Sequence, residues 1–329
     1  MAAKRLSVVI PTYNRRERLR RVLSALERQD ANPDDMEVVI VDDGSTDGTS
    51  QWIAEQRTPY ALQALRLGNG GPGRARNAGV AAATGEIVLF LDDDVEPTKA
   101  LVSEHLRSHE NERDVVVMGP LASLPHYVQP WVSWEQAKVE AQYEAMTRGR
   151  FAPTFRQFWT GNASIEKRHL VATGGFDPSY LRAEDVELGV RLAQHGLGFR
   201  FNPNARGLHH AERSLTSWEN VHESYGRHEV AIFGKLGEGE LLDILADNWS
   251  RVHPSIRVIV IGCLGKPARH AALRRVLHTQ LELARRVPMP WLAQKSCSLL
   301  ANLLYWQASS EALGPARAVR VFGNGAHVA

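Results

Sequence analysis

Residues 86–97 read EIVLFLDDDVEP, a nearly continuous apolar run that ends in three consecutive aspartates. The run has the length of a buried strand, and open α/β sheets bind their ligands where such strands end. Three adjacent carboxylates repel one another unless a cation neutralises them, and oxygen ligands suit Mg²⁺ or Mn²⁺. The alternative is a solvated turn or a helix cap, because aspartate is common in both.

Similar apolar runs alternate with helical patterns on both sides of this stretch. They predict strands at residues 6–10, 37–41, 62–67, 86–91 and 115–118, with helices at 15–29, 46–56 and 74–83. Strands that alternate with helices favour right-handed crossovers and a mostly parallel sheet. We therefore expect an α/β fold of the Rossmann-like kind, whose parallel strands end along one edge.

Two further strands of this sheet are expected to end in polar residues. Residues 38–49 read VVIVDDGSTDGT, in which Asp43 could accept hydrogen bonds from a nucleotide base. Residues 8–15 read VVIPTYNR, which places the ring of Tyr13 just past the first strand, where it could stack on a base. The serine and aspartate side chains could instead cap the helix that follows the strand.

Glu184 and Asp185 open a predicted helix over residues 184–195. The partial positive charge of a helix N-terminus favours ionised carboxylates there. A carboxylate held in this way can act as a general base, although acidic residues also occur in first turns for stability alone.

The chain resembles glycosyltransferase family 2, which has the GT-A fold. The family's motifs occur in the family's order over about two thirds of the chain. They are VVIPTYNR at 8–15, VVIVDDGSTDGT at 38–49, GRARNAG at 73–79, FLDDDVEP at 90–97, WTGNASI at 159–165, GGFD at 174–177 and AEDVELGVRL at 183–192.

The resemblance implies an inverting glycosyltransferase that moves a sugar from a UDP- or dTDP-sugar to an acceptor hydroxyl, in polysaccharide, glycolipid or natural-product glycosylation. It implies Asp185 as the catalytic base, and Asp94 with His209 as ligands of Mn²⁺ or Mg²⁺. The division of roles between Asp93 and Asp94 stays open, because the acidic signature has an extra aspartate in its middle. The residues predicted to bind the substrates are Pro11, Thr12, Tyr13, Asp43, Arg76, Asp92, Asp93, Trp159, Gly161, Asn162 and Glu184.

Two other classes of protein share parts of this pattern. A nucleotidyltransferase of related fold should have a glycine-rich phosphate loop after its first strand, where this chain has Pro-Thr-Tyr-Asn at 11–14. A non-catalytic protein that binds nucleotide sugars would not require Asp185. Packing roles are the alternative for Trp159 and Phe176, and a structural role is the alternative for His209.

The charge is divided unevenly along the 329 residues. Residues 251–329 contain 11 Lys/Arg and two acidic residues, a net of +9, which leaves −7 for residues 1–250 because the whole chain carries +2. Opposite charges in two regions indicate different partners. With two cysteines, the chain has no disulfide framework, and we expect a reducing cytoplasmic compartment and no nucleic-acid partner.

The sequence predicts three regions. Residues 1–213 form the catalytic domain, with a donor half at 1–119 and an acceptor half at 120–213; residues 214–313 form a C-terminal helical region and 314–329 a flexible tail. The uncharged stretch at 296–310 is shorter than the roughly 20 residues that cross a bilayer. With the arginines before it, this stretch could lie on the anionic inner face of a membrane, near a lipid-linked acceptor. Alternatively, its leucines pack onto the catalytic domain and the arginines face water.

Overall fold

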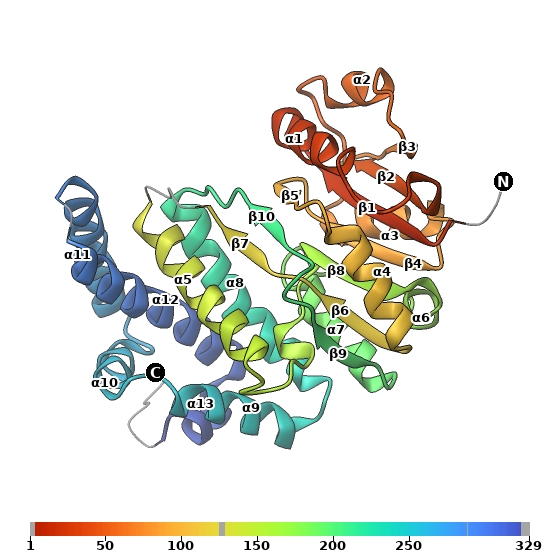
Figure 1. The fold of residues 1–329 in the computed structure, drawn as a ribbon. Coiled ribbons are helices and arrows are strands. Elements are labelled where there is room, and N and C mark those ends of the chain that lie inside the picture. The colour runs from red at the N-terminus through yellow and green to blue at the C-terminus, as the bar shows by residue number, and fades with distance from the viewer. Residues whose placement is uncertain (1–3, 125–128, 288, 324–329) are drawn as a thin grey trace. The chain divides into compact units, whose positions relative to one another are not determined.

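The computed structural model describes residues 4–124, 129–287 and 289–323. The chain divides into two compact units, which Figure 1 shows as ribbons. The first unit contains residues 1–125 and 139–211, and the second contains residues 126–138 and 212–329. Helix α5 (Pro130–Thr147) contributes residues to both.

A seven-stranded sheet forms the centre of the first unit, with strand order β3-β2-β1-β4-β8-β6-β9. Every strand in it is parallel to the others except β8, which runs antiparallel to its neighbours β4 and β6. This confirms the predicted mostly parallel sheet. The strands are β1 (Leu6–Thr12), β2 (Met36–Asp42), β3 (Ala61–Arg66), β4 (Ile87–Leu91), β6 (Val115–Met118), β8 (Asn162–Glu166) and β9 (Gly198–Phe201).

Helices cover both faces of this sheet, because side chains along a strand alternate between its two faces. On β1, Val8 and Ile10 face a core shared with α1 and α4, whereas Val9 faces a core shared with α3 and α7. Helix α3 lies so close to β1 that a Cβ at Gly79 would be 2.3 Å from the Val9 side chain, so the last glycine of GRARNAG permits this packing. The helices of this unit besides α5 are α1 (Arg16–Leu26), α2 (Thr49–Ala54), α3 (Pro72–Ala82), α4 (Leu101–Asn111), α6 (Lys167–Ala172) and α7 (Glu184–Gln194), with 3₁₀ turns at Pro33–Asp35 and Phe155–Gln157.

A second, three-stranded sheet has the order β5-β10-β7. Its strands are β5 (Val95–Pro97), β7 (Leu121–Ser123) and β10 (Gly207–His209). The pairing of β10 with β5 aligns His209 with Val95, next to the three aspartates. This sheet could not be predicted from the sequence, because three-residue strands are too short to show a hydrophobic period.

The second unit contains helices from residue 215 onward. They are α8 (Leu215–Gly234), α9 (Glu238–Ser250), α10 (Pro254–Cys263), α11 (Pro267–Arg286), α12 (Pro290–Leu313) and α13 (Pro315–Phe322). Helix α12 packs along α8, and Leu300, Leu303, Leu304 and Trp306 are buried there. Of the two alternatives for the stretch at 296–310, burial of these side chains favours packing within the protein over contact with a membrane.

The predicted tail is also partly helical. Residues 315–322 form α13, which buries Ala318, Val321 and Phe322. These residues recur with helical spacing behind Pro315, a residue favoured at the start of a helix. The rest of the predicted tail, residues 324–329, lies outside the described residues.

No helix within the described part of the chain is both long enough and apolar enough to cross a bilayer.

Candidate active site

The ends of strands β1, β2 and β4 meet at one edge of the large sheet, as expected from their parallel arrangement. Thr12 at the end of β1 lies opposite Asp42 at the end of β2. The Thr12 hydroxyl donates a hydrogen bond of 2.8 Å to Asp93, which follows β4. Three stretches that are distant in the sequence thus form one polar surface in the first unit.

Two arginines of α1 and the turn before it neutralise the acidic residues that follow β4. Arg15 donates from Nη1 to Asp93 Oδ1 at 2.8 Å and to Asp94 Oδ2 at 3.1 Å. Arg18 donates to the same oxygen of Asp94 at 3.2 Å. Neither arginine was predicted to have a role from the sequence, although Arg15 is the last residue of the VVIPTYNR stretch and Arg18 lies three residues later.

Asp93 is the most enclosed of the three aspartates and is 4% exposed. Burial raises its pKa to about 6, and the neighbouring charge of Asp94 adds to this rise while Arg15 and Thr12 oppose it. Burial disfavours the charged form of a carboxyl group because the protein interior solvates it less well than water does. A cation at this turn would therefore relieve an unfavourable charge.

Asp94 and His209 are predicted metal ligands, and the structure brings them together. His209 Nε2 lies 3.7 Å from Asp94 Oδ1, and the backbone N–H of His210 donates to the Asp94 carbonyl at 2.9 Å. The antiparallel pairing of β10 with β5 produces this proximity. A carboxylate and an imidazole beside further carboxylates form a donor set that suits Mn²⁺ or Mg²⁺, so these residues fit the expected ion.

A different group, Asp114, Glu166 and His169, has its potential ligand atoms within 4.8 Å of one another. Two arginines already neutralise Glu166: Arg113 donates to it at 2.8 Å and Arg168 at 3.0 Å. The group lies at the start of β6 and the end of β8. This is the edge of the sheet opposite Asp92, Asp93 and Asp94, which we call the aspartate turn. We interpret it as a structural ion-pair cluster.

Arg76, in α3, connects the aspartate turn to the start of α7. Its guanidinium donates to Asp92 at 2.8 Å and to Glu184 at 2.7 Å, and the residue is 5% exposed. The two carboxylates hold the pKa of Arg76 above its ordinary value, although burial opposes them. The connection places α7, with Asp185 in its first turn, beside the aspartates that follow β4.

Asp185 is half-buried, and one of its carboxylate oxygens accepts a hydrogen bond of 2.9 Å from the backbone N–H of Val186. Burial and the adjacent charge of Glu184 raise the pKa of Asp185 above its ordinary value, against the effect of Arg76. Ala183, just before it, has a φ of +59°, a conformation that is uncommon for a residue with a side chain. Such backbone strain concentrates at functional sites.

The residues predicted to hold a base differ in how accessible they are. Tyr13 is 44% exposed, so its ring is open to a planar ligand, and Pro11 is partly exposed beside it. Asp43 is buried, and its carboxylate accepts hydrogen bonds from the backbone N–H groups of Gly70 and Gly71 at 2.8–3.1 Å. Asp43 therefore fixes the loop between β3 and α3 at the edge of this site.

The WTGNASI stretch mainly packs within the protein. Trp159 donates from Nε1 to the Gly119 carbonyl at 3.1 Å and packs on Tyr143. Asn162 is fully buried, and its amide bonds to the Ala205 carbonyl at 2.7 Å and to His105 at 2.9 Å. Gly161 lies against the aspartate turn, since a Cβ there would be 3.0 Å from Asp92. Of these three predicted substrate-binding residues, Gly161 is the one that adjoins the acidic residues.

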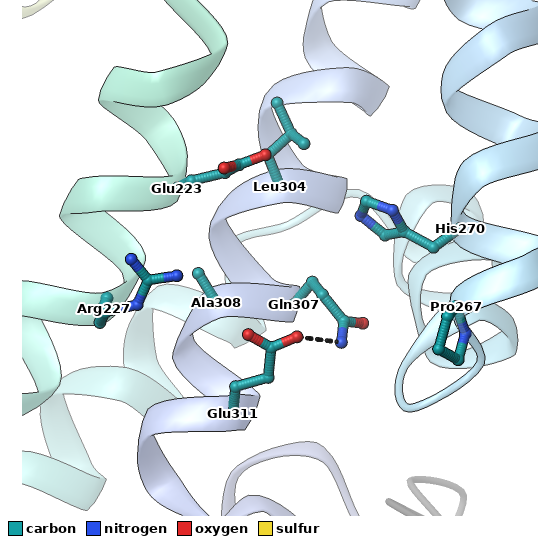
Figure 2. Close-up of a pocket in the computed structure, with 8 residues that line it drawn as sticks. All are labelled: Glu223, Arg227, Pro267, His270, Leu304, Gln307, Ala308 and Glu311. Carbon is teal, nitrogen blue, oxygen red and sulfur yellow. Dashed lines mark hydrogen bonds between the residues drawn. The ribbon is translucent and has the colours of Figure 1, made fainter.

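Two cavities lie in different units of the protein. A cavity of about 300 Å³ beside the start of α1 is lined by Asn14, Arg15, Arg16, Glu17, Arg18 and Asp47. Two of its three arginines, Arg15 and Arg18, contact the aspartate turn. The other, of about 240 Å³, lies among helices of the second unit, and Figure 2 shows the eight residues that line it. None of those eight belongs to the quoted motifs, so we assign the candidate active site to the first unit.

Comparison with known proteins identifies the class. The family model described as "Glycosyl transferase family 2" matches residues 7–169, which contain the three strand ends and Arg76. This segment, just under half of the chain, is similar to glycosyl transferase family 2. An uncharacterized glycosyltransferase of Bacillus subtilis, YfnE, is 30% identical over 252 residues, which are 62% of this chain and 64% of the relative. The chain thus spans less than two thirds of that relative.

Solved structures agree on the fold. The mannosyltransferase PcManGT of Pyrobaculum calidifontis, in complex with GDP-Man and Mn²⁺, superposes with a TM-score of 0.58 at 21% identity, over 93% of this chain and 89% of that one. Residues 1–349 of TarS from S. aureus, in complex with UDP-GlcNAc, give a TM-score of 0.54 at 20% identity, over 92% and 90%. The GT-A fold with C-terminal helices is thereby confirmed.

Proposed function

We propose that the protein is a metal-dependent, inverting glycosyltransferase that moves a sugar from a UDP- or dTDP-sugar to an acceptor hydroxyl. The observation that carries this proposal is the link through Arg76, which joins the aspartate turn to the helix start that holds Asp185. A cation site and a carboxyl group of raised pKa thus occupy one polar surface. In this proposal the cation supports departure of the diphosphate and the carboxyl group takes the proton of the acceptor hydroxyl.

The donor nucleotide occupies the ends of β1 and β2. Tyr13 stacks on the base, with Pro11 and Thr12 beside it, and Asp43 holds the loop that borders the base. Asp92 and Asp93 lie on the ribose side, and Arg76 faces the donor from α3. PcManGT and TarS are in complex with GDP-Man and UDP-GlcNAc in the two solved structures, which supports a nucleotide-sugar donor for this chain.

Asp94 and His209 hold Mn²⁺ or Mg²⁺ in this proposal. When bound, such an ion stabilises the negative charge of the departing diphosphate. The Mn²⁺ in the PcManGT complex supports a divalent cation in a related fold. Arg15 and Arg18, which contact the same aspartates in this structure, supply positive charge next to that site.

Asp185 acts as the general base. It accepts the proton of the acceptor hydroxyl while that oxygen attacks the anomeric carbon, and the nucleoside diphosphate leaves from the opposite face of the sugar. A single displacement of this kind inverts the anomeric configuration. A carboxyl group with a raised pKa suits the role, because a stronger base takes up the proton more readily near neutral pH.

The acceptor is a hydroxyl compound, lipid-linked or part of a glycan, as in polysaccharide or glycolipid formation. We place the donor half at residues 1–119, the acceptor half at 120–213 and a helical region at 214–313. The protein works in the cytoplasm, at the inner face of the cell membrane.

A panel of nucleotide sugars, each tested with Mn²⁺ for thermal stabilisation, identifies the donor, because a ligand that binds the folded state raises the melting temperature. We expect stabilisation by one UDP- or dTDP-sugar and slow release of its nucleoside diphosphate. If a nucleotide sugar binds but no nucleoside diphosphate is released with any acceptor tested, the chain is a non-catalytic binding protein. Release of pyrophosphate from a nucleoside triphosphate would indicate a nucleotidyltransferase.

A further inference from the structure

The helical unit exposes an unusual share of the large apolar side chains. Among the described residues, eleven large hydrophobic side chains are exposed, and six of them lie between residues 258 and 291. They are Val258, Ile259, Val276, Leu283, Val287 and Trp291, of which Val258 is 71% and Trp291 57% exposed. Single exposed apolar residues are ordinary, but a group on neighbouring helices marks an interaction surface.

Four of these residues lie on α11, at its end and at the start of α12. Val276 and Leu283 are seven residues apart on α11, nearly two helical turns, so they share a face. Val287 follows at the end of α11, and Trp291 lies in the first turn of α12. We call Val276, Leu283, Val287 and Trp291 the apolar stripe. Helix α10, which carries Val258 and Ile259, packs against both α11 and α12.

Basic residues accompany the stripe. Arg269 lies seven residues before Val276 on the same face of α11, and Arg275 and Arg286 each directly precede a residue of the stripe. The Nζ of Lys295 lies 5.7 Å from the centre of the Trp291 ring. Residues 251–329 carry a net charge of +9, and of their two acids, Glu282 and Glu311, Glu282 pairs with Arg285 and Arg286.

We propose that this surface, the apolar stripe with its flanking arginines, docks onto an anionic phospholipid membrane. Helices that lie in a membrane interface combine an apolar face with Lys and Arg beside it, and Trp is favoured at the level of the headgroups. Basic side chains are attracted to the negative lipid surface, which gives the charge match. The proposal names a partner for the proposed function and does not depend on catalysis.

The residues assigned here differ from those that the sequence suggests. The leucines of α12 at 299–304 have the apolar character expected of a membrane segment, yet Leu300, Leu303 and Leu304 are buried within the unit. Arginines separate the stripe residues along α11, so the mean hydropathy of this stretch of sequence does not reveal the stripe. The structure shows which face of α11 is exposed, because Leu277, Leu281 and Ala284 lie on the buried face. The stripe residues of α11 lie outside that buried face.

The test is co-sedimentation of the full chain with vesicles of phosphatidylcholine alone or with added phosphatidylglycerol, at low salt. We expect binding to the anionic vesicles and little to the neutral ones, with binding reduced by salt because screening weakens the attraction. Arg269→Gln with Arg275→Gln should weaken binding about fivefold for each charge removed. Leu283→Gln with Trp291→Gln should weaken it about tenfold or more, since both side chains then no longer bury apolar area.

Matched controls are Val171→Ser and Leu181→Gln, which replace exposed apolar residues of the first unit. They should bind vesicles like the wild type, whereas Val276→Ser should bind less. Equal binding to both kinds of vesicle, or wild-type binding by the stripe variants, overturns the proposal. A third outcome also overturns it: the chain binds no vesicles, forms a dimer in sedimentation analysis, and the stripe variants are monomers. The stripe would then join two copies of the chain. Nucleotide-sugar binding, measured on the same variants without vesicles, tests the proposed function separately.

Discussion

Arg76 and Glu184, which lie 108 residues apart in the chain, form a buried ion pair of 2.7 Å. The pair joins α3, which carries GRARNAG, to the first turn of α7, where Asp185 follows. Arg76 also donates to Asp92 at 2.8 Å, so one guanidinium balances two carboxylates from different motifs. This arrangement sets the position of the proposed base relative to the aspartate turn.

Replacing Arg76 with alanine should destabilise the protein by about 3–5 kcal/mol, because removal of one partner leaves buried charge without compensation. Urea denaturation followed by circular dichroism measures this free energy of unfolding. Glu184→Gln is the matched comparison and should cost less, because the amide keeps an oxygen that accepts from Arg76 and Asp92 still balances the arginine. A loss below about 1 kcal/mol for Arg76→Ala would show that the ion pair does not hold α7 in place.

Asp94→Asn should weaken Mn²⁺-dependent binding of the nucleoside diphosphate. Removal of a residue that only hydrogen-bonds to a metal ligand lowers metal affinity roughly 10- to 100-fold. Because Asp94 is a proposed ligand itself, the loss of affinity should be larger. Calorimetric titration of UDP with Mn²⁺, and again with EDTA, gives the two affinities. Asp114→Asn is the control, since Asp114 belongs to the acidic group at the opposite edge of the sheet. Equal UDP affinity with Mn²⁺ and with EDTA would refute the metal site.

Asp185→Asn should keep donor binding but lower turnover by roughly 10²–10⁴, the contribution of a positioned general base. Asparagine preserves the shape of the side chain and the acceptor oxygen for the Val186 N–H, so folding should change little. Single-turnover kinetics at saturating donor separate this loss from weaker binding. Near-normal turnover of this variant would exclude Asp185 as the base.

The raised pKa of Asp185 predicts an acidic limb in the pH profile of kcat/KM. The base acts only when unprotonated, so activity should rise with pH through that pKa and then level off. Because burial and Glu184 shift the pKa upward, the limb should lie above the range of an ordinary aspartate, whose pKa is about 3.9. A profile that stays flat down to the pH of acid unfolding would contradict the assignment.

The strand ends could be predicted from sequence because each signal is local. An apolar run followed by polar residues at 10–14, 41–45 and 91–94 indicates where a parallel strand stops, and parallel strands end at the same edge. The seven-stranded sheet confirms that expectation. The antiparallel strand β8 was not predictable in this way, because its residues alternate between polar and apolar, as Asn-Ala-Ser-Ile-Glu, and lack the apolar run of the other central strands.

Contacts between distant segments are the part that local patterns miss. From the sequence, Arg15 and Arg18 look like ordinary residues at the start of a helix. In the structure, Arg15 donates to Asp93, 78 residues later, and Arg18 donates to Asp94, 76 residues later. His209 reaches Asp94 through a three-residue strand, β10, that has no readable period. Asn162, whose role in substrate binding stays a prediction, is fully buried, and its amide donates to the carbonyls of Ala205 and Pro120, contacts that its sequence motif does not indicate.

The stereochemistry of the transferred sugar tests the central claim most directly. Once the donor panel has identified a UDP- or dTDP-sugar of known anomeric configuration, NMR of the first product formed gives the configuration of the new bond. A single displacement with Asp185 as base predicts inversion, so an α-linked donor yields a β-linked product. Retention of the donor's configuration would contradict the single-displacement mechanism and the role given to Asp185.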